Sequence, residues 1–205
     1  LGEALAKLHL AGSDFTGHRD NALAATKLQP LFESCADRID TIQPGMLAEI
    51  CDELGFLSEH WPRGLPEGVI HADLFPDNVF FLGDRLSGLI DFYFACNDML
   101  AYDIAICLNA WCFENDHSYN VTKGRALLQA YAKVRPLSEA ELAAMPVLAR
   151  GAALRFLATR VVDWLNVPPG ALVRPKSPQE YFRKLRFHQR AKSDHDYGVE
   201  ARELA

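Results

Sequence analysis

The fold of this chain is limited most by the placement of its β-prone runs, which occur only between residues 68 and 94. Residues 69–70 form one run, and the runs 79–82 and 86–90 flank a turn at residues 83–85. Elsewhere the apolar residues recur at three- and four-residue intervals, as they do on one face of a helix. The pattern predicts an α+β fold in which a mainly helical lobe surrounds one small β-hairpin.

Helical segments can be placed by their spacing and by their end signals. Ser138 with Glu141, and Ser177 with Glu180, have the spacing of a capping box and predict two helix starts. Gly12 is suited to end a first helix, which the spacing of three leucines places at the beginning of the chain. Residues 44–60, most of the chain after residue 98, and in particular residues 146–165 are also predicted to be helical.

The composition is typical of a soluble globular protein. Of 205 residues, 49% are hydrophobic and 23% are charged, which suits a chain that buries one sizeable core. The net charge of −6 argues against a dedicated nucleic-acid binder, because that function needs a basic excess. The five cysteines form no C-x-x-C pair, no signal peptide is visible, and no apolar run reaches the ~18 residues that span a bilayer. We therefore expect a cytoplasmic protein without a membrane or nucleic-acid partner.

Three side chains with oxygen donors gather in the strand region. Asp73 and Asn78 lie five residues apart in the loop HADLFPDN, and Asp91 ends the returning strand of the hairpin. Because a hairpin brings its two ends together, Asn78 and Asp91 can face the same point in space. One carboxylate and one amide oxygen suit Mg²⁺, which completes its coordination with phosphate and water. The sequence therefore predicts a magnesium site at the base of the hairpin.

The remaining carboxylate, Asp73, is left free to accept a proton from a substrate hydroxyl that attacks a terminal phosphate. Its spacing to Asn78 equals that of the catalytic Asp and Asn in the H-R-D-x-x-x-x-N loop of protein kinases, and Asp91-Phe92 matches the start of D-F-G. We expect His71 to support the loop by hydrogen bonding, and Asp77 to be solvated or to cap the loop. The combined pattern favours phosphoryl transfer.

Three segments resemble the C-terminal lobe of bacterial homoserine kinases of the aminoglycoside phosphotransferase-like superfamily, over nearly the whole chain. The resemblance implies a protein-kinase-like fold, ATP and Mg²⁺ as cofactors, and transfer of the ATP γ-phosphate to the side-chain hydroxyl of L-homoserine in threonine biosynthesis. It also implies Asp73 as catalytic base, His71 as its loop support, Asn78 and Asp91 as magnesium ligands, and Asp103 as a brace of the loop. The segments are HADLFPDNV, LIDFYFACNDMLAYDIAICLNAWCFE and RGAALRFLATRVVDWLNVPPGALVRPKSPQEYFRKLRFHQ.

The N-terminal lobe of such kinases has no visible counterpart in this chain. No Gly-rich loop precedes the catalytic stretch, and Lys7 and Lys27 lie in helical or loop contexts that do not suit a strand lysine. We expect residues 1–205 to be a C-terminal catalytic lobe whose nucleotide lobe lies upstream, with residues 193–205 as a flexible tail. Because positioning and charge neutralisation of ATP supply most of the acceleration, we expect the fragment alone to be impaired.

Homoserine is a small zwitterion, so its site should offer a cation to the carboxylate and acceptors to the ammonium group. Arg150, Arg155 and Arg160 recur at five-residue steps, which rotates each by about 140° around a helix, so they cannot all point inward. Arg155 and Arg160 are the candidates for the carboxylate. Asn97 and Asp98 are the candidates for the ammonium group, although Asp98 is equally suited to cap the next helix.

Other interpretations remain open at this point. His71, Asp73 and Asp91 could instead hold a transition metal for hydrolysis, although no second histidine motif supports it. A non-catalytic, kinase-like binding module is a further alternative, and within the kinases choline or aminoglycoside acceptors remain possible. Trp111 and Trp164 are expected to pack in the core.

Overall fold

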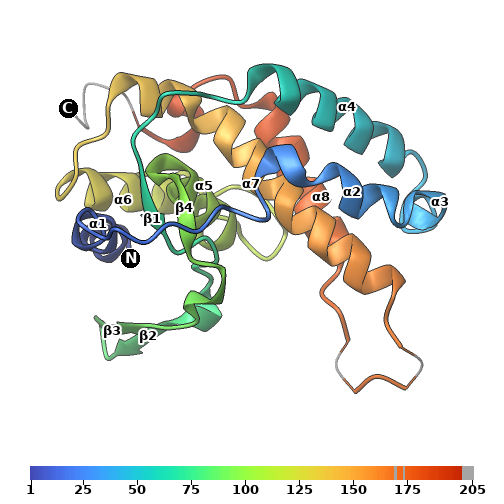
Figure 1. The fold of residues 1–205 in the computed structure, drawn as a ribbon, viewed down its shortest axis with the longest axis horizontal. Coiled ribbons are helices and arrows are strands. Elements are labelled where there is room, and N and C mark those ends of the chain that lie inside the picture. The colour runs from blue at the N-terminus through green and yellow to red at the C-terminus, as the bar shows by residue number, and fades with distance from the viewer. Residues whose placement is uncertain (169, 173, 200–205) are drawn as a thin grey trace.

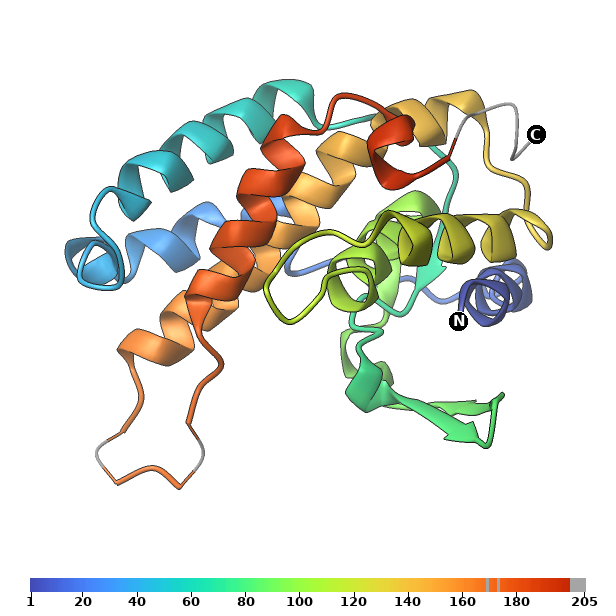
Figure 2. The same ribbon diagram turned by 180° about the vertical axis from the view of Figure 1, so that it is seen from behind.

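The computed structural model describes residues 1–199 except residues 169 and 173, as a helical body from which one hairpin projects (Figures 1 and 2). The fold class is as predicted, α+β with most residues in helices. The α-helices are α1 (Gly2–Ala11), α2 (Gln29–Glu33), α3 (Ala36–Ile39), α4 (Met46–His60), α5 (Leu100–Trp111), α6 (Val121–Ala132), α7 (Glu139–Leu165) and α8 (Pro178–Arg190). The strands are β1 (Glu67–Ile70), β2 (Val79–Leu82), β3 (Arg85–Leu89) and β4 (Cys96–Met99), and 3-10 turns occupy Ala25–Lys27, Pro76–Asn78, Phe92–Phe94 and Asp194–Tyr197.

The central helix is α7, which runs diagonally through the molecule and packs against α5, α8, α2 and α4 (Figure 1). Its predicted capping box is confirmed, because Ser138 and Glu141 each accept a hydrogen bond from the other's backbone N–H. The helix continues through Pro146, which removes one backbone donor without breaking it. By length and composition α7 could cross a membrane, but 78% of its most apolar stretch is buried inside the fold. Packing therefore accounts for its apolar character.

The predicted hairpin is formed by β2 and β3, which pair antiparallel from Val79 with Leu89 to Leu82 with Arg85. Its turn is shorter than predicted, since Arg85 already belongs to the strand. Gly83 has a φ of +60°, a backbone conformation that favours glycine in tight hairpin turns. In both views the hairpin extends away from the helical body (Figures 1 and 2).

A second two-stranded sheet was not predicted. Its strand β4 carries Asn97 and Asp98, two residues of low β propensity, and was expected to lead directly into a helix. Tertiary pairing overrides that propensity: β4 pairs antiparallel with β1, with Ile70 opposite Cys96. The sheet places the start of α5 beside the start of β1, and Asp103 in the first turn of α5 then reaches the loop that follows β1, which carries the candidate catalytic residues.

Residues 193–199, the first part of the predicted flexible tail, pack against the helical body and include the 3-10 turn Asp194–Tyr197. The Tyr197 ring is fully buried, and its hydroxyl lies 2.9 Å from His188 Nδ1. Val199 is buried as well, so apolar contacts outweigh the polar composition of the segment. Residues 200–205, also part of the predicted tail, lie outside the described residues.

Two other local expectations are corrected by the structure. Ser177 caps α8, but Glu180 does not complete a capping box, because its carboxylate binds Arg160 and Lys184 instead. Trp164 is 43% exposed and so does not pack in the core. Trp111 is partly buried, and its indole N–H donates to the carbonyl of Leu74 at 2.8 Å.

Candidate active site

The loop after β1 is held in place by a buried carboxylate beneath it. Both oxygens of Asp103, on α5, accept backbone N–H groups from the loop, from His71 at 2.7 Å and from Ala72 at 2.9 Å. Ala72 has a φ of +63°, which is unusual for a residue with a side chain. The two bonds to Asp103 stabilise this conformation, so Asp73 projects from a loop with a fixed backbone.

His71 uses both of its ring nitrogens within the loop. Nε2 lies 2.9 Å from the carbonyl oxygen of Ile90 and Nδ1 lies 3.3 Å from the backbone N–H of Asp73, so Nε2 carries the proton and Nδ1 accepts. A histidine with both nitrogens engaged in this way has none left for a metal ion. This geometry opposes the alternative in which His71, Asp73 and Asp91 hold a transition metal. In the part of the chain that is described, no cluster of three His, Cys, Asp or Glu side chains suits such an ion.

The two ends of the hairpin meet next to Asp73. The backbone carbonyl of Asn78 accepts the N–H of Ile90 at 3.0 Å, which places Asp91 beside Asn78. The Asn78 side-chain amide donates to the Asp73 carbonyl at 2.8 Å and approaches the Asp73 carboxylate at 3.4 Å. Because the amide nitrogen is used in these contacts, the amide oxygen is the atom left for a ligand. Asp91 does not end the strand as predicted: it lies two residues beyond β3, with a φ of +63°, and precedes the 3-10 turn Phe92–Phe94.

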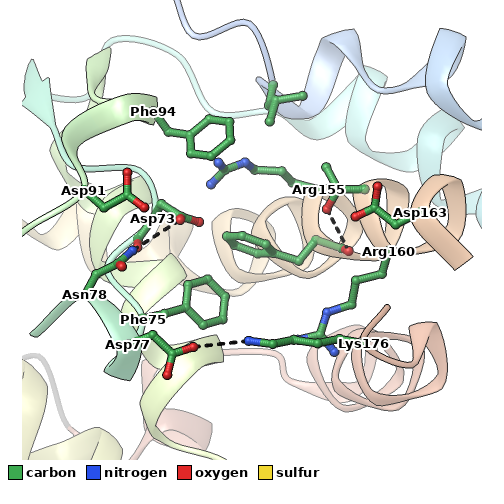
Figure 3. A pocket seen from close by; sticks show the side chains of 13 residues that line it. Asp73, Phe75, Asp77, Asn78, Asp91, Phe94, Arg155, Arg160, Asp163 and Lys176 are labelled. Atoms are coloured by element: carbon green, nitrogen blue, oxygen red, sulfur yellow. Dashed lines mark hydrogen bonds and ion pairs between the residues drawn. The ribbon is translucent and has the colours of Figure 1, made fainter. Parts of the chain in front are cut away.

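A cavity of about 450 Å³ opens between this loop and α7 (Figure 3). Asp73, Asn78 and Asp91 lie on one side of it, whereas Arg155 and Arg160 reach in from α7 on the other. The structure therefore brings together five of the candidate residues. The remaining lining residues are Leu23, Phe75, Asp77, Phe94, Phe156, Thr159, Asp163 and Lys176.

Part of this lining was detectable in the sequence. Phe156, Thr159, Arg160 and Asp163 follow the i, i+3, i+4, i+7 spacing of one helix face, so Arg160 indicated that Thr159 and Asp163 would share its surroundings. Lys176 carried no such signal, because it lies in the connection between α7 and α8 and depends on how that connection folds.

The cavity environment raises the pKa of the Asp73 carboxyl above its ordinary value. Burial is the main cause, because it disfavours the charged form. The nearby positive charge of Arg155 opposes this effect, and the negative charge of Asp91 adds to it. A carboxylate with a raised pKa binds a proton more readily, which is the property that a general base needs.

The two arginines on α7 differ in their partners. Arg160 Nη1 lies 2.6 Å from a carboxylate oxygen of Glu180 and 3.2 Å from the Ser177 carbonyl. Arg155 is only 2% exposed and donates through Nη1 to the carbonyl of Ala72, in the loop after β1. Arg160 thus ties α7 to α8, and Arg155 ties α7 to the loop.

Asn97 and Asp98 lie on β4 and do not line the cavity. The Asn97 side chain accepts the backbone N–H of Arg19 at 2.9 Å, and Asp98 accepts the side chain of Asn21 at 2.7 Å. Asp98 also accepts the N–H of Met99, which is itself the residue that precedes α5, so Asp98 is not its N-cap. Both side chains hold the segment around residues 19–21 instead.

Residues 1–137, more than half of the chain, match the phosphotransferase enzyme family. The chain belongs to this family. The expected phosphotransferase fold is thereby confirmed, and the HADLFPDN loop lies inside the matched region.

Similar sequences are named homoserine kinase. The homoserine kinase of Bradyrhizobium diazoefficiens is 68% identical over 200 residues, which are 97% of this chain and 61% of that protein. The homoserine kinase of Parvibaculum lavamentivorans is 64% identical over 201 residues, 98% of this chain and 63% of that protein. The chain therefore spans about three fifths of the length of these relatives.

Solved structures with the same fold are more distant in sequence. A choline/ethanolamine kinase family protein from Mesorhizobium loti superposes with a TM-score of 0.66 at 16% identity, covering 99% of this chain and 64% of that one. An ethanolamine kinase from Plasmodium vivax gives 0.64 at 14% identity, covering 91% and 58%. At these identities the likeness concerns the fold alone.

Proposed function

We propose that this chain is the C-terminal lobe of an ATP-dependent kinase that phosphorylates the side-chain hydroxyl of L-homoserine to O-phospho-L-homoserine, a step towards threonine. The observation that carries the proposal is the identity of 64–68% with homoserine kinases over nearly the whole chain. The grouping of Asp73, Asn78 and Asp91 at one side of a cavity supports it, since these residue types suit phosphoryl transfer.

In the proposed reaction, Asp73 accepts the proton of the substrate hydroxyl while that oxygen bonds to the γ-phosphorus and the bond to ADP breaks. The raised pKa of Asp73 supports this role, because burial makes the carboxylate a better proton acceptor. His71 and Asp103 act as positioning residues, holding the loop that carries Asp73. Asn78 fixes the other end of that loop through its amide group.

The side chains at the base of the hairpin fit a magnesium ion. Asn78 has its amide oxygen free of the hydrogen bonds that engage its nitrogen, and Asp91 adds one carboxylate. One amide and one carboxylate oxygen form a donor set that Mg²⁺ accepts when phosphates and water complete its coordination. We propose Asn78 and Asp91 as its ligands. When bound, the ion neutralises charge on the phosphates.

We also propose that a nucleotide-binding lobe of the same enzyme, upstream of this chain, supplies the remaining contacts to ATP. The chain spans about three fifths of its relatives, so their proteins have room for such a lobe. The projecting hairpin exposes Phe80, Phe81 and Leu82 by 54%, 49% and 79%. Apolar side chains gathered in this way are typical of a covered surface, and the upstream lobe would cover them.

The experiment that tests the function is turnover of Mg-ATP by the reading frame extended upstream, with L-homoserine, choline and an aminoglycoside offered separately. Of the three acceptors, we expect only L-homoserine to give ADP release. Asp73→Asn should abolish it, whereas Asp52→Asn, on the exposed side of α4, should leave it unchanged as a matched control. Turnover of choline or an aminoglycoside instead of L-homoserine would contradict the proposed acceptor. Absence of any turnover by a folded protein that binds Mg-ATP would favour a non-catalytic binding module.

A further inference from the structure

The three basic side chains that line the cavity differ in whether a carboxylate already neutralises them. Arg160 pairs with Glu180 at 2.6 Å, and Lys176 pairs with Asp77 at 3.3 Å. Arg155 forms no ion pair within the described part of the chain, and its Nε atom is buried without a hydrogen-bond partner. Arg155 is therefore the cavity cation that has no carboxylate within ion-pair distance in the described part of the chain.

A buried cation without a counter-charge lowers the stability of the protein when no ligand is bound. Arg155 is 2% exposed, and its guanidinium lies 4.5 Å from the ring centre of Phe156 and 5.5 Å from that of Phe94. The aromatic faces compensate only part of the lost hydration, since a buried charge normally needs a paired, hydrogen-bonded counter-charge. The unpaired cation faces the cavity beside Asp73, where the acceptor must bind for its hydroxyl to reach the base (Figure 3).

The edge of the guanidinium that remains free can be identified. Arg150 binds Glu53 through Nε and Nη2 at 2.7 and 2.6 Å, and Arg186 binds Glu49 through the same two atoms. In Arg155, Nη1 donates to the Ala72 carbonyl and Nε has no partner. The Nε–Nη2 edge is thus the one left, and it is the edge with which Arg150 and Arg186 bind their carboxylates. The two parallel N–H groups of this edge match the two coplanar oxygens of a carboxylate.

We propose that Arg155, rather than Arg160, receives the carboxylate of the acceptor on its Nε–Nη2 edge, and so selects an alcohol that bears a carboxylate over an amino alcohol that lacks one. This inference rests on the proposed function and deepens it. Arg155 reaches the cavity from α7, whereas Asn78 and Asp91 lie on the far side of Asp73 (Figure 3). The acceptor then binds on the α7 side of Asp73, and the phosphates on the hairpin side.

The test compares L-homoserine with 3-amino-1-propanol, which is the same alcohol without its carboxylate, in the enzyme extended upstream. Arg155→Lys keeps the charge and a donor for Ala72 but loses the two-nitrogen edge. We expect it to raise the KM for L-homoserine about 10- to 100-fold and to reduce the preference for L-homoserine by a similar factor, with the KM for ATP within about threefold. Arg160→Lys, which retains a cation for Glu180, should alter that preference less than about threefold.

Other results would contradict either the role of Arg155 or the proposed acceptor. Equal losses for both alcohols in Arg155→Lys would show that Arg155 only holds the loop, and a raised KM for ATP alone would assign its free edge to a phosphate. Preferred turnover of 3-amino-1-propanol by the unmodified enzyme would overturn both the inference and the proposed acceptor. If no alcohol is turned over, the proposed function fails. In that case, calorimetry measures the Kd of L-homoserine for the unmodified enzyme and for Arg155→Lys. Equal Kd values would refute the role of Arg155 in binding the carboxylate.

Discussion

His9 Nε2 lies 3.1 Å from Asp103 Oδ2, and both side chains are completely buried. The contact joins α1 to the carboxylate that holds the loop with the candidate base Asp73. His9 Nδ1 lies 2.8 Å from the hydroxyl of Tyr131, which itself accepts a hydrogen bond from Arg135 at 3.3 Å. Because the Asp103 carboxylate can only accept, His9 donates its Nε2–H to it. Burial alone would raise the pKa of Asp103, but the bonds from His9, His71 and Ala72 outweigh it and lower that pKa.

This contact predicts that one polar substitution of His9 impairs the enzyme and that another is tolerated. Glutamine places an amide nitrogen near the position of Nε2 and keeps a donor for Asp103, whereas asparagine is too short to reach it. We expect His9→Asn to lower kcat about 10- to 100-fold and stability by about 1–3 kcal/mol, because a buried charged acceptor loses a donor. His9→Gln should stay within about fivefold of the unmodified enzyme in kcat. Steady-state kinetics and urea unfolding measure both, and equal losses in the two variants would contradict a role through Asp103.

The raised pKa of Asp73 predicts how the rate depends on pH. Because the base must be unprotonated, kcat/KM should rise with pH through a midpoint above the ordinary value of an aspartate. Removing the positive charge in Arg155→Gln should move that midpoint to higher pH, since Arg155 lowers the pKa of Asp73. Arg63→Gln, at an exposed position after α4, is the matched control. A midpoint that stays in place or falls in Arg155→Gln would argue against Asp73 as the titrating group.

Glu180 predicts a pH-dependent contribution to stability. Burial raises its pKa, but the hydrogen bonds from Arg160 and Lys184 outweigh burial and hold the pKa at about 2, below the ordinary 4.5. A lowered pKa means that the contribution is complete above pH 4.5 and is lost as the pH falls towards 2. We expect Glu180→Gln to cost about 1–3 kcal/mol of unfolding free energy at pH 7, with the difference shrinking below pH 4.5.

Urea unfolding of both proteins across this pH range measures the effect of Glu180. Glu59→Gln, at an exposed position on α4, controls for loss of a glutamate charge. If the difference in unfolding free energy between the unmodified protein and Glu180→Gln is constant between pH 7 and pH 3, the ion pairs do not stabilise the packing of α8 on α7.

The cysteines predict selective labelling of one thiol. Cys51 is exposed on α4, whereas Cys35, Cys96, Cys107 and Cys112 are buried. Burial also raises the pKa of Cys96 to about 11 and that of Cys112 to about 12, which lowers the thiolate fraction at neutral pH. Brief alkylation of the native enzyme followed by peptide mapping should modify Cys51 far faster than the other four. Comparable modification of any buried cysteine before unfolding would contradict this packing.

Features that depend on neighbouring residues were predictable from the sequence. The hairpin, the capping box of α7 and the loop spacing between Asp73 and Asn78 each involve groups only a few residues apart. A turn, a cap or a short loop is limited by local backbone geometry, which residue type and spacing encode directly. For the same reason, the meeting of Asn78 with the residues before Asp91 followed from the hairpin itself.

Partners that are distant in the chain were decided only by tertiary packing. The sequence alone determined a mainly helical fold with the pattern of Asp73, Asn78 and Asp91 at the base of a hairpin. It did not indicate that β4 pairs with β1, that His9 contacts Asp103, or that Glu180 neutralises Arg160 and leaves Arg155 unpaired. A charged or polar side chain can satisfy its hydrogen bonds with many partners of the same type. Which partner it meets depends on how whole helices pack, and packing is set by contacts spread over the entire core.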